Sequence, residues 1–256
     1  RMTDPTGVFQ HAKFSVPNFS EGYCTDDNAR AFILATSLGE IGQHAEYAYN
    51  LSTVTLAFLF HAFDRERMRF HNHMSFDRQW LDETGSDDCQ GRALWALGVG
   101  VGRSRVRSFQ MMAGQLFLES LPLLQTLTSP RAWSFGLIGI HEYLQRLSGD
   151  SMVRQIRDDL ANRLLELYRK VSRPDWRWFE DILTYDNAKI AHAMILSGQG
   201  TGQQEFLDCG LESLRWLMDL QTSDKGYFRP IGNDGFYPRG GEYAHFDQQP
   251  IEAHAT

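Results

Sequence analysis

The stretch that decides the fold is 93–101, which reads Ala-Leu-Trp-Ala-Leu-Gly-Val-Gly-Val. It is apolar nearly all round and rich in small residues. A helix without a polar face has to be buried on all sides, and small residues let neighbouring backbones approach closely. Three other segments share this character: 31–38, 135–140 and 190–196. The sequence therefore predicts a set of fully buried inner helices.

A second kind of helix alternates with the first along the chain. The segment 151–171 surrounds an apolar stripe with Arg, Asp, Glu and Lys, and 203–221 is similar. A charged face with an apolar stripe is typical of the outside of a bundle. The pattern predicts repeated helical hairpins of inner and outer helices. The expected helices are 26–39, 45–63, 87–101, 104–127, 131–147, 151–171, 186–197, 203–221 and one starting near 247.

Such an alternation predicts an all-α fold, an (α/α)6 toroid with buried helices inside and amphipathic helices outside. An open α-solenoid is the alternative, but its inner helices would normally show a polar concave face. We count four hairpins and the start of a fifth, so we expect a single toroid domain, 1–256, that is incomplete at its C-terminus. Two segments break the helical pattern, Met68–Trp80 and Gly226–Arg239. We expect the second to be a β-hairpin that turns at Asn233-Asp234-Gly235.

Composition excludes several classes of protein. Hydrophobic residues make up 42% and charged residues 22% of the 256 residues, which favours a folded core over disorder. The net charge of −7 argues against a general nucleic-acid binder, and no run of about 18 apolar residues suggests a membrane span. Three scattered cysteines predict neither a disulfide framework nor a zinc site. Because the chain starts at Arg1 without a signal-peptide pattern, we expect a piece of a longer, cytoplasmic protein.

Acidic clusters open most of the inner helices. They lie at 25–30, 86–92, 185–189 and 242–250, and the spacing from Asp27 to Asp88 equals that from Asp186 to Asp247, 61 positions. In a toroid these helix starts lie at one mouth. Capping explains any single acid, and Thr25 and Ser86 can serve as caps. The second acid of each pair is then surplus. The predicted catalytic residues are Asp27, Asp88, Asp186 and Asp247, with Glu180, Asp181 and Glu242 as further acids.

Carboxylates in this pattern suit sugar chemistry. Glycoside cleavage needs one carboxylic acid and one carboxylate, and crowding raises the pKa of one member of a pair. Aromatic rings stack on sugar C–H surfaces, and Asn and Arg bind hydroxyls, although the rings could also only cover the end of the toroid. The predicted substrate-binding residues are Asn28, Arg30, Arg92, Trp176, Trp178, Asn187, His192, Tyr243, His245 and Gln248. Arg30 and Arg92 could instead neutralise the acids.

Two histidines leave a different chemistry open. His192 lies in the fourth inner helix and His245 lies close to Asp247. Each is either a satisfied structural residue or the general acid or base of a sugar epimerase. His71 and His73 have no apparent third ligand, so we predict no metal site. The sequence has no Gly-rich phosphate loop, and we predict no cofactor.

Four stretches together resemble a bacterial family of six-hairpin, glycosidase-like (α/α)6-toroid domains. They are GYCTDDNARA (22–31), SDDCQGRALWALG (86–98), DWRWFEDILTYDNAKIAHAMI (175–195) and GGEYAHFDQQPIEA (240–253). That family occurs alone or next to glycosyltransferases and mannoside phosphorylases. The resemblance implies the toroid fold, a carbohydrate substrate and a glycosyltransferase partner. It implies no catalytic assignment, and this chain ends short of the last hairpins.

The leading hypothesis from the sequence is a glycoside hydrolase that acts on an oligosaccharide through paired carboxylates at the mouth of the toroid. A sugar epimerase or isomerase of the same fold, using His192 or His245, is the first alternative. A non-catalytic glycan-binding module that serves a glycosyltransferase is the second.

Overall fold

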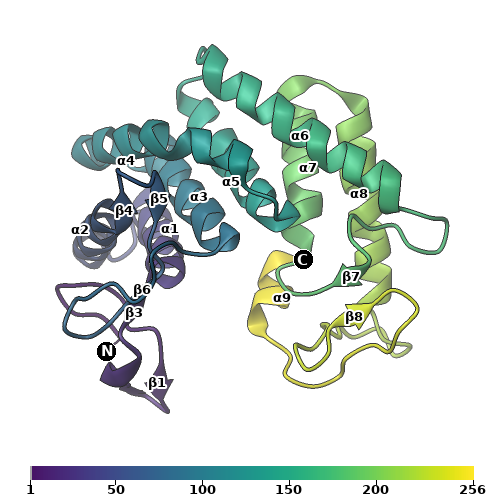
Figure 1. The fold of residues 1–256 in the computed structure, drawn as a ribbon, viewed down its shortest axis with the longest axis horizontal. Helices are drawn as coiled ribbons and strands as arrows, with labels where there is room; N and C mark the ends of the chain where they lie inside the picture. The colour runs from purple at the N-terminus through teal and green to yellow at the C-terminus, as the bar shows by residue number, and fades with distance from the viewer. Residues whose placement is uncertain (1) are drawn as a thin grey trace. The chain divides into compact units, whose positions relative to one another are not determined.

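The computed structural model describes residues 2–256 and divides the chain into two compact units (Figure 1). Unit 1 ends at Ile156, and unit 2 runs from Arg157 to Thr256. The expectation of a single domain stays a prediction.

Unit 1 is built from helical hairpins. Its helices are α1 (Thr25–Ile41), α2 (Ala45–Ala62), α3 (Asp87–Arg103), α4 (Arg107–Ser120) and α5 (Pro130–Arg146), with 3-10 turns η1 (Phe19–Glu21) and η2 (Leu121–Thr126). Helix α6 (Ser151–Val171) begins in unit 1 and ends in unit 2. Helices α1 and α2 pack as one hairpin, α3 and α4 as the next, and α3 lies against both α1 and α5 (Figure 1).

Helix α3 is the centre of unit 1, as its apolar sequence predicts. Its residues from Cys89 to Val101 are buried, apart from a half-exposed Trp95. Its backbone touches that of α5: a Cβ added to Gly98 would lie 2.0 Å from the carbonyl oxygen of Gly139. A Cβ on Gly139 would lie 2.5 Å from the carbonyl oxygen of Leu94. Only glycine permits this approach.

Short antiparallel strand pairs tie the insertions of unit 1 to its helices. They are β1 (Ala12–Lys13) with β2 (Val16–Pro17), β3 (Tyr23–Cys24) with β6 (His73–Met74), and β4 (Phe63–Asp64) with β5 (Arg69–Phe70). Because β3 leads directly into α1, its pairing with β6 brings the 68–80 insertion to the start of that helix. The hydroxyl of Thr25 also donates to the carbonyl of His71 at 2.6 Å.

Unit 2 holds one more complete hairpin, α7 (Ala188–Thr201) and α8 (Gln204–Leu220), followed by the short helix α9 (Pro250–Ala255). Close approach again joins the helices, since a Cβ on Gly210 would lie 2.8 Å from the carbonyl oxygen of Ala191. The expected β-hairpin within 226–239 is wrong. Strand β8 (Tyr237–Pro238) pairs with β7 (Ile182–Leu183), and Gly232 bridges to Gln248. The turn at 233–235 does form, but its flanks find partners elsewhere in the unit.

Three of the differences between the predicted and the observed helices have a clear cause in the backbone. The expected helix 104–127 divides into α4 and η2, where Pro122 removes a backbone donor. Helix α7 begins at Ala188 rather than 186, and α9 at Pro250 rather than 247. Asp186 and Asp247 have φ of 54° and 57°, a left-handed conformation that a right-handed helix cannot include. Among the described residues, no helix is both long and apolar enough to cross a membrane.

Candidate functional site

In unit 1 the starts of α1, α3 and α5 lie together, and ion pairs join each helix to the next. Asp26 on α1 lies 3.2 Å from the Nε of Arg92 on α3, and its other oxygen accepts from the Nδ2 of Asn72 at 3.1 Å. Asp88 on α3 lies 3.5 Å from Arg131 on α5 and accepts from the hydroxyl of Ser129 at 3.0 Å. We call these six residues the N-terminal cluster. Each of these acids therefore contacts a cation of the next inner helix, and the convergence of the acids on one mouth stays a prediction.

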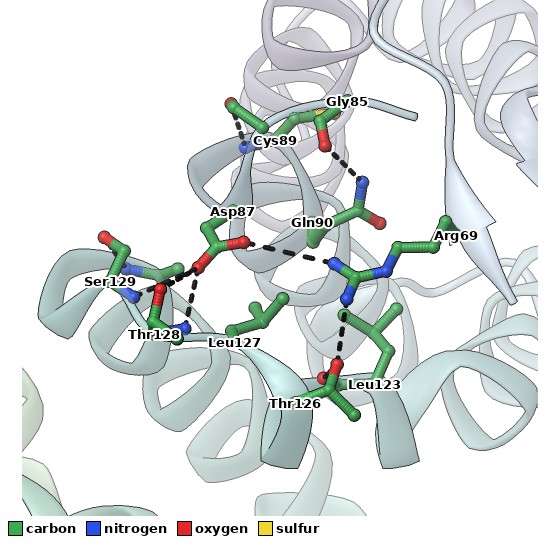
Figure 2. Close-up of polar contacts among 12 residues, drawn as sticks. Arg69, Gly85, Asp87, Cys89, Gln90, Leu123, Thr126, Leu127, Thr128 and Ser129 are labelled. Carbon is green, nitrogen blue, oxygen red and sulfur yellow. Dashed lines mark hydrogen bonds and ion pairs between the residues drawn. The ribbon is translucent and has the colours of Figure 1, made fainter. Parts of the chain in front are cut away.

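Asp87 is also bound across the helices. Its carboxylate accepts from the backbone N–H groups of Thr128 at 2.7 Å and Ser129 at 3.1 Å, and lies 4.0 Å from Arg69 (Figure 2). Because two amides hold it, Asp87 fixes the loop that enters α5.

Burial shapes the chemistry of Asp26. Desolvation raises the pKa of this carboxyl above its ordinary value, and the charges of Arg92 and Arg30 and the hydrogen bond from Asn72 oppose the rise. Arg92 is almost fully buried, and its guanidinium carbon lies 4.2 Å from the centre of the Phe135 ring. The pair thus combines a desolvated acid with a cation that packing holds in place.

Asp27, the predicted catalytic acid of α1, is used locally instead. It accepts from the thiol of Cys24 at 3.1 Å and pairs with Arg30 at 3.0 Å, one turn along the same helix. The predicted cap Thr25 is wrong, because Cys24 is the N-cap and the Thr25 hydroxyl bonds to His71. The predicted cap Ser86 is confirmed, since its hydroxyl accepts from the N–H of Cys89. Asn28 is fully buried and uses its amide on Val8 and Cys24.

In unit 2 a second group gathers at the start of α7. Glu252 on α9 is 1% exposed, and its carboxylate accepts from the N–H of Asp186 and from the Nδ2 of Asn187, the latter at 3.0 Å. Lys189 is buried in the first turn of α7, and His192, half-buried, follows three positions later. We call Asp186, Asn187, Lys189, His192 and Glu252 the C-terminal cluster. Burial raises the pKa of Glu252, and the hydrogen bonds from Asn187 and Asp186 oppose the rise.

The structure places the predicted sugar-stacking tryptophans inside unit 2. Trp176 is 3% exposed and Trp178 is fully buried. Both pack against Trp216, with ring centres 5.1 Å and 6.1 Å away. The indole N–H of Trp176 donates to the carbonyl of Glu180 at 2.7 Å. Rings held in this way cover the helices of the unit, and their faces are not available to stack on a sugar.

The remaining predicted residues are spread over the loops of unit 2. Asp181 is exposed and pairs with Arg239 at 3.2 Å. The hydroxyl of Tyr243 donates to the carbonyl of Arg229, whose guanidinium lies over the same ring. His245 contacts the Tyr243 ring, with centres 5.5 Å apart. Exposed side chains belong to Glu242, His245, Asp247 and Gln248, while Glu180 is half-buried. A common mouth for the acids of both units stays a prediction.

The predicted site residues omit six members of the two clusters: Asp26, Asn72, Ser129, Arg131, Lys189 and Glu252. Asn72 reaches Asp26 only because β3 pairs with β6. Arg131 lies at the start of α5, which carries no acid, so the sequence pattern did not indicate that Arg131 pairs with Asp88. Glu252 had one available signal: it lies 66 positions after Asp186, as Arg92 lies 66 positions after Asp26. Among residues 2–256, no group of three or more His, Cys, Asp or Glu side chains could hold a metal ion.

The helical arrangement is similar to that of two solved enzymes. Cellobiose 2-epimerase from Bacillus thermoamylovorans B4167 matches with a TM-score of 0.74 at 9% identity, over 95% of this chain and 72% of that one. A sugar epimerase from a ruminal bacterium matches with a TM-score of 0.73 at 11% identity, over 94% and 71%. The fold is an α/α toroid.

The predicted fold class, with short β insertions, is thus confirmed, and at these identities the likeness extends to the fold alone. No family model and no curated protein matches the chain. The glycosyltransferase association that the family resemblance implied finds no support in these matches.

Proposed function

We propose that the protein is a sugar epimerase, which inverts the configuration at the carbon next to the reducing-end carbonyl of an oligosaccharide. The observation that carries this proposal is the fold, which it shares over nearly its whole length with two sugar epimerases. Fold alone does not fix chemistry. The second support is His192, a half-buried histidine one turn inside the inner helix α7.

The chemistry needs a base and a proton donor. In the open-chain sugar, the carbonyl at C1 acidifies the proton on C2. A neutral imidazole removes that proton, the electron pair moves onto the carbonyl oxygen as an enediolate, and a proton returns to C2 from the opposite face. His192 is our candidate for one of these proton transfers, with His245 as the candidate for the other. The buried ammonium of Lys189, on the same helix, suits the stabilisation of negative charge on the enediolate oxygen.

The same geometry gives less support to the hydrolase hypothesis. Hydrolysis needs one carboxyl group that keeps its proton to protonate the leaving oxygen. Asp27 and Asp88, two of the predicted catalytic acids, are instead engaged by arginines, at 3.0 Å and 3.5 Å. The substrate class, a short oligosaccharide, is common to both hypotheses.

Deuterium labelling separates the hypotheses. The purified protein would be incubated with cellobiose, and separately with mannobiose, in D2O. An epimerase exchanges the C2 hydrogen for deuterium and forms the C2 epimer, which NMR detects. A hydrolase instead releases monosaccharide without label at C2, and a binding module does neither. Either of these last outcomes, with both sugars, would refute the proposal.

A matched pair of variants tests the role of the histidine. His192→Asn should lower the exchange rate at C2 by about 10²–10⁴-fold. His141→Asn changes another half-buried histidine of an inner helix, one that lies in the C-terminal half of α5, and should leave the rate unchanged. Equal rates for the two variants would exclude His192 from the proton transfer.

A further inference from the structure

The start of α7 has the geometry of an anion-binding nest. Asp186 has φ of 54°, and the next residue, Asn187, is right-handed, with φ of −59° and ψ of −46°. Consecutive residues of opposite hand direct their backbone N–H groups into one concavity, which binds negative charge. The carboxylate of Glu252 occupies that position, where it accepts from the N–H of Asp186 and from the Asn187 side chain.

Unit 1 has a contact with the same sequence spacing. In unit 1, Arg92 contacts the side chain of Asp26, 66 positions earlier; in unit 2, Glu252 contacts the backbone of Asp186, also 66 positions earlier. The later residue is a cation in unit 1 and an anion in unit 2. Its partner differs accordingly: a carboxylate in unit 1, and the amide N–H of the left-handed Asp186 in unit 2. In both units, the later residue secures the start of the preceding inner helix.

We infer that Glu252 is a positioning residue, which locks the start of α7 and so holds His192 in the orientation that proton transfer requires. This inference rests on the proposed function for its catalytic part. Its structural part rests only on the nest. Because α9 is too short to be stable as a helix on its own, the contact with the nest is what holds the C-terminal segment. The Glu252 carboxylate thereby makes α9 a latch on α7.

Glu252→Gln is the sharpest test, because it keeps the shape of the side chain. Both carboxylate oxygens accept from N–H donors, so in either orientation of the amide its NH2 group faces a donor. Glu252→Asp keeps the charge but withdraws it by one methylene, and serves if the glutamine variant does not fold. Glu166→Gln, which changes an exposed glutamate of unit 2, is the matched control.

Two readouts do not require catalysis. Hydrogen exchange should become about tenfold faster at the first amides of α7 in Glu252→Gln and stay unchanged in Glu166→Gln. The imidazole NMR signal of His192, assigned by its loss in His192→Asn, should shift only in the Glu252 variants. Unchanged exchange and an unchanged imidazole signal would overturn the latch, whatever reaction the protein catalyses.

The catalytic part has its own readout. If the wild type epimerises cellobiose, Glu252→Gln should lower kcat about tenfold and leave KM within about twofold, because the sugar contacts remain while the base is misoriented. An unchanged kcat in a folded variant would overturn the positioning role. A wild type without epimerase activity would refute the proposed function, and hydrogen exchange would still decide the latch.

Discussion

The contact between α3 and α5 makes a quantitative prediction for Gly98→Ala. The new Cβ would lie 2.0 Å from the carbonyl oxygen of Gly139, whereas ordinary contacts begin near 3.4 Å. The obstacle is backbone, which cannot rotate away as a side chain can. The two helices would have to separate by more than an ångström along a contact that is buried on both sides. Overpacking of this kind costs about 1–3 kcal/mol, and more where no side chain can yield.

The preference of helices for alanine works in the opposite direction. It is worth about 1 kcal/mol, so from an overpacking cost at the upper end, about 3 kcal/mol, we expect a net loss of about 2 kcal/mol and a fall in Tm of about 4–8 °C. Gly39→Ala is the control, because Gly39 lies in α1 with open space around its Cβ direction. That variant should be as stable as the wild type or slightly more stable.

Thermal unfolding followed by far-UV circular dichroism measures both effects in the same buffer. The reasoning would be refuted if Gly98→Ala melted at or above the temperature of Gly39→Ala. Such a result would mean that α3 and α5 are not in backbone contact. The helix start that holds Asp88 would then also be placed differently from the structure.

Three further predictions follow from buried polar groups. Burial raises the pKa of Asp26 above its unfolded value of 3.8, so its titration contributes stability that is fully present below that value and is lost as pH rises through the folded pKa. In urea denaturation across this range, the unfolding free energy of Asp26→Asn should therefore rise relative to that of the wild type as pH increases. A difference that stays constant with pH would contradict the raised pKa. A double-mutant cycle of Asp88→Asn with Arg131→Gln should give a coupling free energy of about 1–3 kcal/mol. The more exposed pair Asp27–Arg30 should give less than about 1 kcal/mol. Equal coupling energies would argue against a special role for the inter-helix pair. The fully buried side-chain amide of Gln221 has no hydrogen-bond partner among the described residues. Gln221→Met should therefore raise the unfolding free energy by about 1–2 kcal/mol, measured by calorimetry. A lower unfolding free energy would mean that the amide has a hydrogen-bond partner.

The helices were predictable because their pattern is local. The small apolar run of α3 requires burial whatever surrounds it, and the charged face of α8 requires solvent. Boundaries failed where one residue leaves the helical conformation, as Asp186 does. The N–H of Asp186 contacts Glu252, 66 positions away, and a local sequence window cannot show such a contact.

The candidate site was predictable only in outline. The acidic helix starts indicated that carboxylates gather, but not which member of each pair faces the neighbouring helix. Asp27 faces its own helix, while Asp26 faces α3. The burial of Trp176 and Trp178 could not be predicted, because aromatic rings near helix starts have the same sequence pattern whether they bind a ligand or fill the interior.

The segment 68–82 is fastened to the start of α1 at its base, and its tip packs on the N-terminal segment, where Phe76 stacks on Phe19 and Arg78 donates to Thr6. Asp82 accepts from the amides of Asn72 and His73, and Asn72 contacts Asp26 in turn, whereas Phe76 and its neighbours Asp77, Arg78 and Gln79 are exposed. A redesigned tip would therefore have to keep its packing on the N-terminal segment. New loop sequences that do so could be grafted at the tip without disturbing the inter-helix pairs beneath the base.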